Sequence, residues 1–180
     1  MEKITIVGLG YVGMSIAIVL SKNNNITVID IDKKKIELIK SNKPTINDLD
    51  IINYYKLHDV SLNATNDSKT AYKDAKFIII AVPTNYDEDR NYFDTSSIET
   101  VIKNILHFNT QATIVIKSTI PVGYITKIKK YFNYDKIIFS PEFLREGFSL
   151  QDNLYPSRII IGDTTSEARE FGYVLSESAE

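Results

Sequence analysis

Short runs of apolar and mostly β-branched residues recur along the chain, separated by longer segments in which apolar positions follow a helical period. The runs do not alternate between apolar and polar residues, which is the pattern expected of strands that are covered on both faces. They predict strands at 4–7, 26–30, 77–82, 113–118 and 136–140, with weaker candidates at 59–64 and 158–162.

Between these strands, apolar residues three and four positions apart predict amphipathic helices. One stripe consists of Val12, Ile16, Val19 and Leu20, and another of Ile98, Val101, Ile102, Ile105 and Leu106. Ser96 and Glu99 have the spacing of a capping box, which predicts that the second helix begins there. Segments 33–40, 122–132 and 167–180 also have helical character.

The order of these elements predicts the fold class. Strands that alternate with helices form a parallel sheet with right-handed crossovers, so we expect an α/β, Rossmann-like, doubly wound and mostly parallel sheet of about six or more strands with helices on both faces. The 180 residues are enough for one domain with its own core. The helical segment 167–180 simply stops, without a glycine cap or a turn, so we expect the sequence to be part of a longer protein.

Composition and charge exclude several classes of function. The formal net charge is −2, so no basic field predicts a nucleic acid or a membrane surface as a partner. No apolar run is long enough for a membrane span, and the N-terminus lacks the pattern of a secretion signal, so a cytoplasmic protein is expected. The absence of cysteine excludes disulfides, thiolate metal sites and a cysteine nucleophile within these residues, and His58 and His107 stand apart from any metal-like cluster.

The first predicted strand runs into the sequence GLGYVG at 8–13, and a helix follows. This is the dinucleotide-binding fingerprint in the context that it requires, between a strand and a helix. Gly8 permits the tight turn, Gly10 lets the backbone approach a pyrophosphate, and Gly13 lets the helix pack close to the strand. The exposed N–H groups of the loop and the positive end of the helix dipole would then face the phosphates.

Asp30 closes the second predicted strand, 22 residues after Gly8, where an acid would bind the adenosine ribose hydroxyls. A carboxylate there would repel the 2′-phosphate of NADP, so Asp30 favours NAD. Lys33, Lys34 and Lys35 complicate this preference because a lysine could offset the repulsion, although a solvated first helical turn also explains them. The alternative for the whole motif is a glycine turn with a surface aspartate.

Ligands of a doubly wound sheet bind beyond the carboxyl ends of its strands. Those ends carry Thr84, Thr119 and the segment 140–142. Either threonine alone could equally cap a helix or form a turn. Their joint position at the edge where ligands bind favours a role in a site.

The segment 140–147 reads SPEFLREG and contains two glutamates, Glu142 and Glu146, four positions apart. Pro141 can start a helical turn, which would place both glutamates on one face, with Arg145 three residues from Glu142. A helix N-terminus that uses acids to suit its dipole is the alternative. Beside a dinucleotide site, a carboxylate for proton transfer or water activation is the better hypothesis.

Five motifs follow one another in order, namely VGLGYVG (7–13), VPTN (82–85), KSTIPVG (117–123), SPEFLREG (140–147) and YPSRIIIG (155–162). Together they resemble the UDP-glucose 6-dehydrogenases of the UDP-glucose/GDP-mannose dehydrogenase family, and the match runs along essentially the whole chain. SPEFLREG and KSTIPVG are far more specific than the glycine loop. The resemblance implies that 1–180 form an N-terminal NAD-binding Rossmann domain, with the family's central helix and sugar-nucleotide domain outside this sequence.

The resemblance also implies a reaction, in which the C6 alcohol of UDP-glucose is oxidised twice, by two NAD, to UDP-glucuronate for polysaccharide biosynthesis. A cysteine in the later part of the family's chain holds the intermediate as a thiohemiacetal and then as a thioester, which water hydrolyses. Glu142 would act in acid/base chemistry with that water, Thr119 would help to hold it, and Glu146 is the third catalytic candidate.

By motif position, the residues expected to bind NAD are Gly8, Gly10, Tyr11, Val12, Gly13, Asp30, Lys35, Thr84, Thr119 and Glu146. Those expected to line the sugar nucleotide are Glu142, Phe143, Leu144, Arg145 and Glu146. The resemblance further implies a homodimer for the full-length protein. The family's dimer contacts lie largely on the missing helix, so residues 1–180 do not themselves give the oligomeric state.

This sequence departs from the family because it has no cysteine and stops before the family's catalytic lysine and asparagine. We therefore expect it to bind NAD but to catalyse nothing alone. A dehydrogenase for another sugar nucleotide, GDP-mannose or UDP-N-acetylmannosamine, is an alternative, because nothing before residue 180 fixes the base or the sugar. A non-catalytic NAD-sensing Rossmann module is a second alternative, but such a module would have no use for paired glutamates near Thr119.

Overall fold

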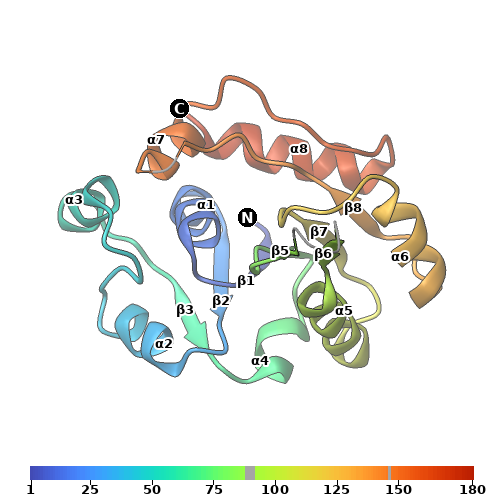
Figure 1. Ribbon diagram of the computed structural model, residues 1–180. Coiled ribbons are helices and arrows are strands. Elements are labelled where there is room, and N and C mark those ends of the chain that lie inside the picture. Colours follow the sequence, from blue (N-terminus) through green and yellow to red (C-terminus); the bar gives the residue numbers. More distant parts are fainter. Residues whose placement is uncertain (88–91, 146) are drawn as a thin grey trace.

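The computed structural model describes residues 1–87, 92–145 and 147–180, and its centre is a six-stranded sheet (Figure 1). Each pair of neighbouring strands in this sheet runs parallel, in the order β3-β2-β1-β4-β7-β8. The strands are β1 (Lys3–Val7), β2 (Asn25–Ile29), β3 (Asn63–Thr65), β4 (Phe77–Ile80), β7 (Thr113–Ile116) and β8 (Ile137–Phe139). A separate antiparallel hairpin is formed by β5 (Asn85–Asp87) and β6 (Tyr92–Asp94).

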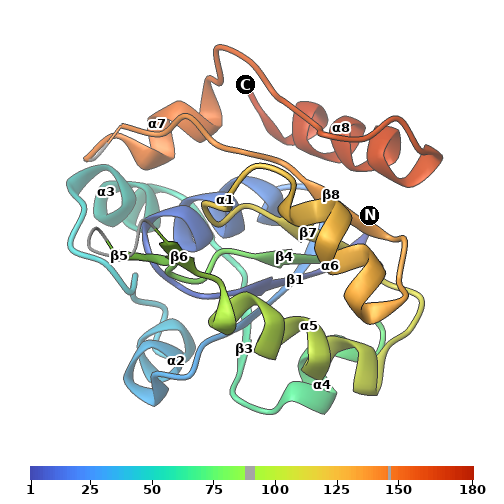
Figure 2. The same ribbon diagram turned by 45° about the vertical axis from the view of Figure 1, so that its right-hand side comes forward.

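Helices cover both faces of the sheet, as the strand–helix alternation predicts (Figures 1 and 2). One face is covered by α1 (Tyr11–Ser21), α3 (Leu49–Leu57), α7 (Ser149–Leu154) and α8 (Ser166–Ser178). The other is covered by α4 (Ser68–Tyr72), α5 (Ser96–Phe108) and α6 (Tyr124–Phe132). The remaining helix, α2 (Lys33–Lys40), lies beside the edge strand β3. Within the described part of the chain, no helix combines the length and the apolar character needed to cross a membrane.

The strands divide their side chains between two apolar clusters, one on each face. Ile6 and Ile79 are paired neighbours in β1 and β4, and both belong to the cluster under α1. Ile78 and Ile80 of β4 belong to the opposite cluster, under α5. Because successive strand residues point to opposite faces, strands buried on both sides have to be continuously apolar, which is why the runs in the sequence located them.

The strand expected at 158–162 is not formed. This segment passes β8 and makes one backbone hydrogen bond to it, from the Gly162 N–H to the Phe139 carbonyl (2.7 Å). The carbonyl of Ile160 accepts from the hydroxyl of Ser140 instead (3.1 Å), because the Ser140 N–H already donates to Ile116 (3.0 Å). The next residue, Pro141, has no N–H with which to continue a ladder.

The capping box expected at Ser96 is also wrong by one position. The N-cap of α5 is Thr95, whose hydroxyl donates to Glu99 Oε1 (3.1 Å). The Ser96 N–H donates to Oδ1 of Asp94 (3.0 Å). The side chains of Asp94 and Thr95 therefore share the capping contacts that the sequence pattern assigns to Ser96 alone.

Candidate functional site

The glycine loop follows β1, and its first and third glycines are required by packing. Gly8 has φ +95°, a conformation that favours glycine, and a Cβ on it would lie 2.5 Å from the Ala81 carbonyl oxygen. A Cβ on Gly13 would lie only 1.8 Å from the carbonyl oxygen of Gly8. Both glycines are therefore explained by the close contact of backbone segments, whether or not a ligand is present.

Gly10 has a different environment. Apart from Gly10 itself and its two chain neighbours, none of the described residues has an atom within 4 Å of the position that its Cβ would take. It is the N-cap of α1, and a glycine has no side chain to occupy the N–H groups of the first helical turn. The open space therefore adjoins free backbone donors at the positive end of a helix dipole, an arrangement that fits a pyrophosphate.

Asp30 lies beside this loop, buried to 8% relative exposure. Its carboxylate accepts from the N–H groups of Leu9 (2.7 Å) and Asp32 (2.9 Å). Of the three lysines that complicate the choice of cofactor, Lys35 reaches Asp30, with its Nζ 3.2 Å from Oδ2. Asp30 is thus held in place between the glycine loop and α2, where a ribose bound to that loop would meet it.

The two candidate threonines follow adjacent strands. Thr84 comes after β4 and is half-buried, and Thr119 comes after β7 and is exposed. Between these strand ends the Ser118 hydroxyl donates to the carbonyl of Val82 (2.7 Å), which ties the two segments together. The structure therefore brings both threonines to the same edge as the glycine loop.

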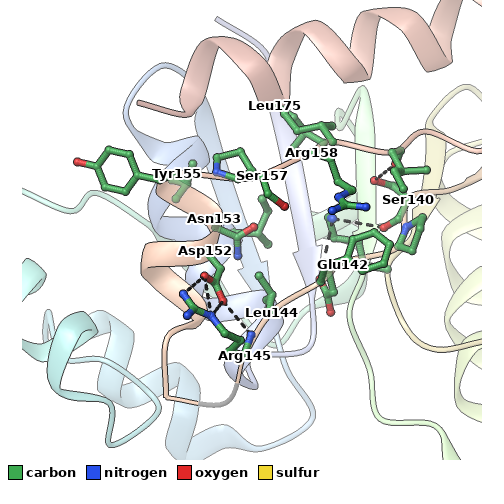
Figure 3. A pocket seen from close by; sticks show the side chains of 18 residues that line it. Ser140, Glu142, Leu144, Arg145, Asp152, Asn153, Tyr155, Ser157, Arg158 and Leu175 are labelled. Carbon is green, nitrogen blue, oxygen red and sulfur yellow. Dashed lines mark hydrogen bonds and ion pairs between the residues drawn. The ribbon is translucent and has the colours of Figure 1, made fainter.

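Beyond the ends of β7 and β8 lies a cavity of about 410 Å³ (Figure 3). Side chains from α1, α7 and α8 form part of its wall, and the rest comes from Lys117 and the segments 140–145 and 155–160. Ser140 and Glu142 lie on one side of the cavity, and Arg145 and Asp152 lie on the opposite side. The expected sugar-nucleotide residues Glu142, Phe143, Leu144 and Arg145 all line this cavity.

Glu142 is the carboxylate of this cavity with the largest change in acidity. Its side chain is 16% exposed, and burial raises the pKa of Glu142 to about 7, while the nearby Lys117 ammonium acts in the opposite direction. Among the described residues, Glu142 Oε2 has no hydrogen-bond partner, although Lys117 Nζ lies 3.9 Å away. A carboxyl that titrates near neutrality can both accept and return a proton, as acid/base chemistry requires.

The helical turn expected after Pro141 is not formed, and residues 141–145 are irregular. Arg145 turns away from Glu142 and pairs with Asp152 of α7, with Nη2 2.6 Å from Oδ1. The Arg145 N–H also donates to Asp152 (2.8 Å), so the bidentate partner on α7 replaces the weaker contact expected within one helix turn. Glu146, expected to act in catalysis and to bind both NAD and the sugar nucleotide, lies outside the described residues.

Two cationic side chains of the cavity, those of Lys117 and Arg158, were not among the predicted site residues. Lys117 is buried at the end of β7, and Arg158 places its guanidinium 5.7 Å from the ring centroid of Phe143. Lys117 carried a signal in the sequence, because a lysine directly follows the buried run 113–116. Arg158 belongs to the motif YPSRIIIG, but no site role was predicted for that motif.

The raised pKa of Glu142 predicts a pH-dependent stability. The folded state binds this proton more tightly than the unfolded state, so the group stabilises the fold below its unfolded pKa and loses that contribution as the pH rises to about 7. Glu142→Gln mimics the protonated acid. It should match the wild type in urea unfolding at about pH 3.5, below the unfolded pKa, and be more stable by about 3 kcal/mol at pH 8.

The matched control for this measurement is Glu37→Gln, which changes an exposed glutamate on α2. Equal effects of the two substitutions at pH 8 would mean that Glu142 is not destabilised by burial.

The comparisons with known proteins agree with this geometry. Residues 2–178 match the model of the UDP-glucose/GDP-mannose dehydrogenase family, NAD binding domain. The chain is 48% identical over 180 residues to a UDP-glucose 6-dehydrogenase of Campylobacter jejuni, which covers 99% of this chain and 46% of that protein. It is 48% identical over 183 residues to one of Streptococcus pneumoniae, covering 98% of this chain and 46% of that protein.

A solved structure of a UDP-glucose dehydrogenase from Pyrobaculum islandicum superimposes with a TM-score of 0.87 at 23% identity, covering 100% of this chain and 45% of that one. This likeness confirms the predicted Rossmann-like fold. The family match confirms NAD as the cofactor. The chain spans about half the length of the relatives it matches.

Proposed function

This chain belongs to the UDP-glucose/GDP-mannose dehydrogenase family, and we propose that it supplies the cofactor half of a UDP-glucose 6-dehydrogenase. The proposed reaction is the oxidation of UDP-glucose at C6 to UDP-glucuronate with two NAD. The observation that carries the proposal is the open space at Gly10, bounded by the first turn of α1 and close to the buried carboxylate of Asp30.

In this proposal the chain's own residues bind NAD in two places. The glycine loop and the first turn of α1 hold the pyrophosphate, and Asp30 with Lys35 faces the adenosine ribose. Thr84 and Thr119 line the edge along which the nicotinamide half lies. NAD, when bound there, accepts the hydride of the substrate carbon.

Glu142 supplies the proton chemistry. Its carboxyl can take a proton from water and return it, and Thr119 helps to hold that water. The cavity beside Glu142, lined in part by 142–145, receives the sugar end of the substrate. A module that only senses NAD would need none of these groups, so the acid/base character of Glu142 favours an enzyme.

We also propose that the remaining catalytic residues, the choice of sugar nucleotide and the dimer contacts belong to the part of the relatives' length that this chain does not span. The thiol that forms the covalent intermediate would come from there, because this sequence has no cysteine. We place the enzyme in the cytoplasm, where it would provide UDP-glucuronate for polysaccharide biosynthesis.

The experiment that tests the cofactor site is calorimetric titration of this chain with NAD and NADP. Asp30 would repel a 2′-phosphate, so NAD is expected to bind about tenfold or more tightly than NADP. Asp30→Asn keeps an oxygen that can accept from the Leu9 N–H but removes the charge. It should therefore reduce the difference between the affinities for NAD and NADP.

The control variant is Lys34→Met, which removes a neighbouring exposed lysine that makes no ion pair with Asp30 among the described contacts. It should leave the ratio of the two affinities unchanged. Equal or tighter binding of NADP by the wild type would contradict the assignment of Asp30.

A further inference from the structure

Lys117 is a buried lysine to which the proposed function gives no role. Its relative exposure is 6%, at the carboxyl end of β7. The Lys117 N–H donates to the carbonyl of Ile80 (2.9 Å), which fixes the backbone at this position to β4. Burying an ammonium costs free energy unless it meets partners, so its surroundings have to explain why it is there.

The pairing of β7 with β8 determines where the side chain points. Ile116 lies opposite Phe139, so the next residue of each strand, Lys117 and Ser140, are also neighbours. The Lys117 Nζ donates to the carbonyl oxygen of Ser140 (3.3 Å) and lies 3.9 Å from Glu142 Oε2. The ammonium thus contacts the segment 140–142 at both of its ends, and this segment places Glu142 at the cavity wall.

The other charged groups of the cavity are occupied elsewhere. From α7, Asp152 neutralises Arg145. From the segment 155–160, Arg158 lies over the ring of Phe143, and the Tyr155 hydroxyl donates to Glu180. The wall contributed by α1 and α8 is apolar, formed by Ile16, Val19 and Leu175. Within the described residues, Lys117 is therefore the cation that forms an ion pair with Glu142.

We propose, building on the function proposed above, that Lys117 is a positioning residue whose buried ammonium holds the Glu142 carboxylate at the cavity wall and keeps it charged until it takes up a proton. Burial alone pushes the pKa of Glu142 upward, and the neighbouring positive charge limits that rise. Burial also lowers the pKa of Lys117, while Glu142 opposes that change. Each charge therefore opposes the shift that burial gives to the pKa of the other group.

A purely structural lysine would make a different prediction. If the ammonium served only to satisfy the Ser140 carbonyl, its removal would cost stability and leave the titration of Glu142 unchanged. If it acts on Glu142, the titration changes whether or not stability does. The carboxyl pKa therefore distinguishes the two roles.

The test is a ¹³C NMR titration of the Glu142 carboxyl in this chain without NAD, for the wild type, Lys117→Met and Lys117→Arg. Methionine keeps much of the volume and removes the charge, so the pKa of Glu142 should rise by about one to three units. Arginine restores a positive charge and should bring the pKa back toward the wild-type value. Lys129→Met, which removes an ion pair between α6 and Asp163 outside the cavity lining, should leave the pKa of Glu142 unchanged.

An unchanged or lower pKa of Glu142 in Lys117→Met would overturn the proposal. If that variant fails to fold, the reciprocal measurement decides, because Glu142→Gln should lower the pKa of Lys117 by a similar amount, followed by ¹⁵N NMR of the ammonium. No shift of Lys117 there would also overturn it. These titrations need no NAD, so a failure to bind NAD would contradict the proposed function and leave this result standing.

Discussion

A Gly10→Val variant of this chain is expected to fold normally and to lose about 100-fold or more in affinity for NAD. Gly10 has an extended backbone, with φ −84° and ψ −165°, which any residue can adopt, and its Cβ position is open among the described residues. The valine side chain would occupy the space in front of the first turn of α1, where the pyrophosphate has to approach the backbone. Calorimetry gives the affinity, and thermal unfolding gives the stability.

The matched variant is Gly13→Ala. Alanine adds fewer atoms than the valine of Gly10→Val, yet Gly13→Ala should lower the stability more. The new Cβ would lie 1.8 Å from the Gly8 carbonyl oxygen, so the helix and the loop cannot keep their places. We expect a loss of about 3 kcal/mol, which lowers the melting temperature by about 6 to 12 °C. A Gly10→Val variant that keeps its affinity for NAD would show that the open space is not the pyrophosphate site.

In the complete enzyme proposed above, Glu142→Gln is expected to lower turnover by about 10²- to 10⁴-fold. The amide cannot take up a proton from water, so hydrolysis should stop and the covalent intermediate should accumulate. The affinity for NAD should change little, because the proposed pyrophosphate and ribose contacts belong to the glycine loop and Asp30, not to Glu142. Rapid quenching followed by mass spectrometry of the intact protein measures the trapped intermediate.

Glu170→Gln provides the control for general effects of removing a carboxylate. Glu170 lies on α8, where it pairs with Lys76 outside the cavity. The Glu170→Gln variant should keep wild-type turnover and accumulate no covalent intermediate. Wild-type turnover in Glu142→Gln would instead show that Glu142 has no part in the proton chemistry.

The sequence located most of the sheet because the strands are covered on both faces. Where that coverage fails, the prediction fails too. At the edge of the sheet, the strand expected at 59–64 forms only over Asn63–Thr65, which pairs with β2 alone. The helix α3 was not predicted, because Ile51 is its one fully buried residue and a single position makes no apolar stripe of helical period. Its N-cap, Asp48, accepts from the N–H groups of Asp50 and Ile51.

The parts of the site that depend on neighbours in the sequence were also predictable. The glycine loop and Asp30 belong to one strand–helix–strand unit, and their spacing fixes their geometry. The two ion pairs of the cavity depend on distant contacts. Lys117 meets Glu142 only because of the register of β7 with β8, and Arg145 meets Asp152 only because α7 folds back over the segment before it.

The position of α1 constrains how this protein can evolve. Its residues from Gly13 to Leu20 are all buried, its first turn faces the space proposed for the cofactor, and Ile16 and Val19 form part of the cavity wall. Ser15 also accepts from Asn153 of α7 (2.8 Å), which joins the helix to the element that carries Asp152. Few positions on α1 can therefore be substituted without consequence, and a substitution among its buried residues would need compensating substitutions in α7 or α8. Variation that adapts the domain to new partners has to accumulate on the exposed faces of helices such as α5 and α6.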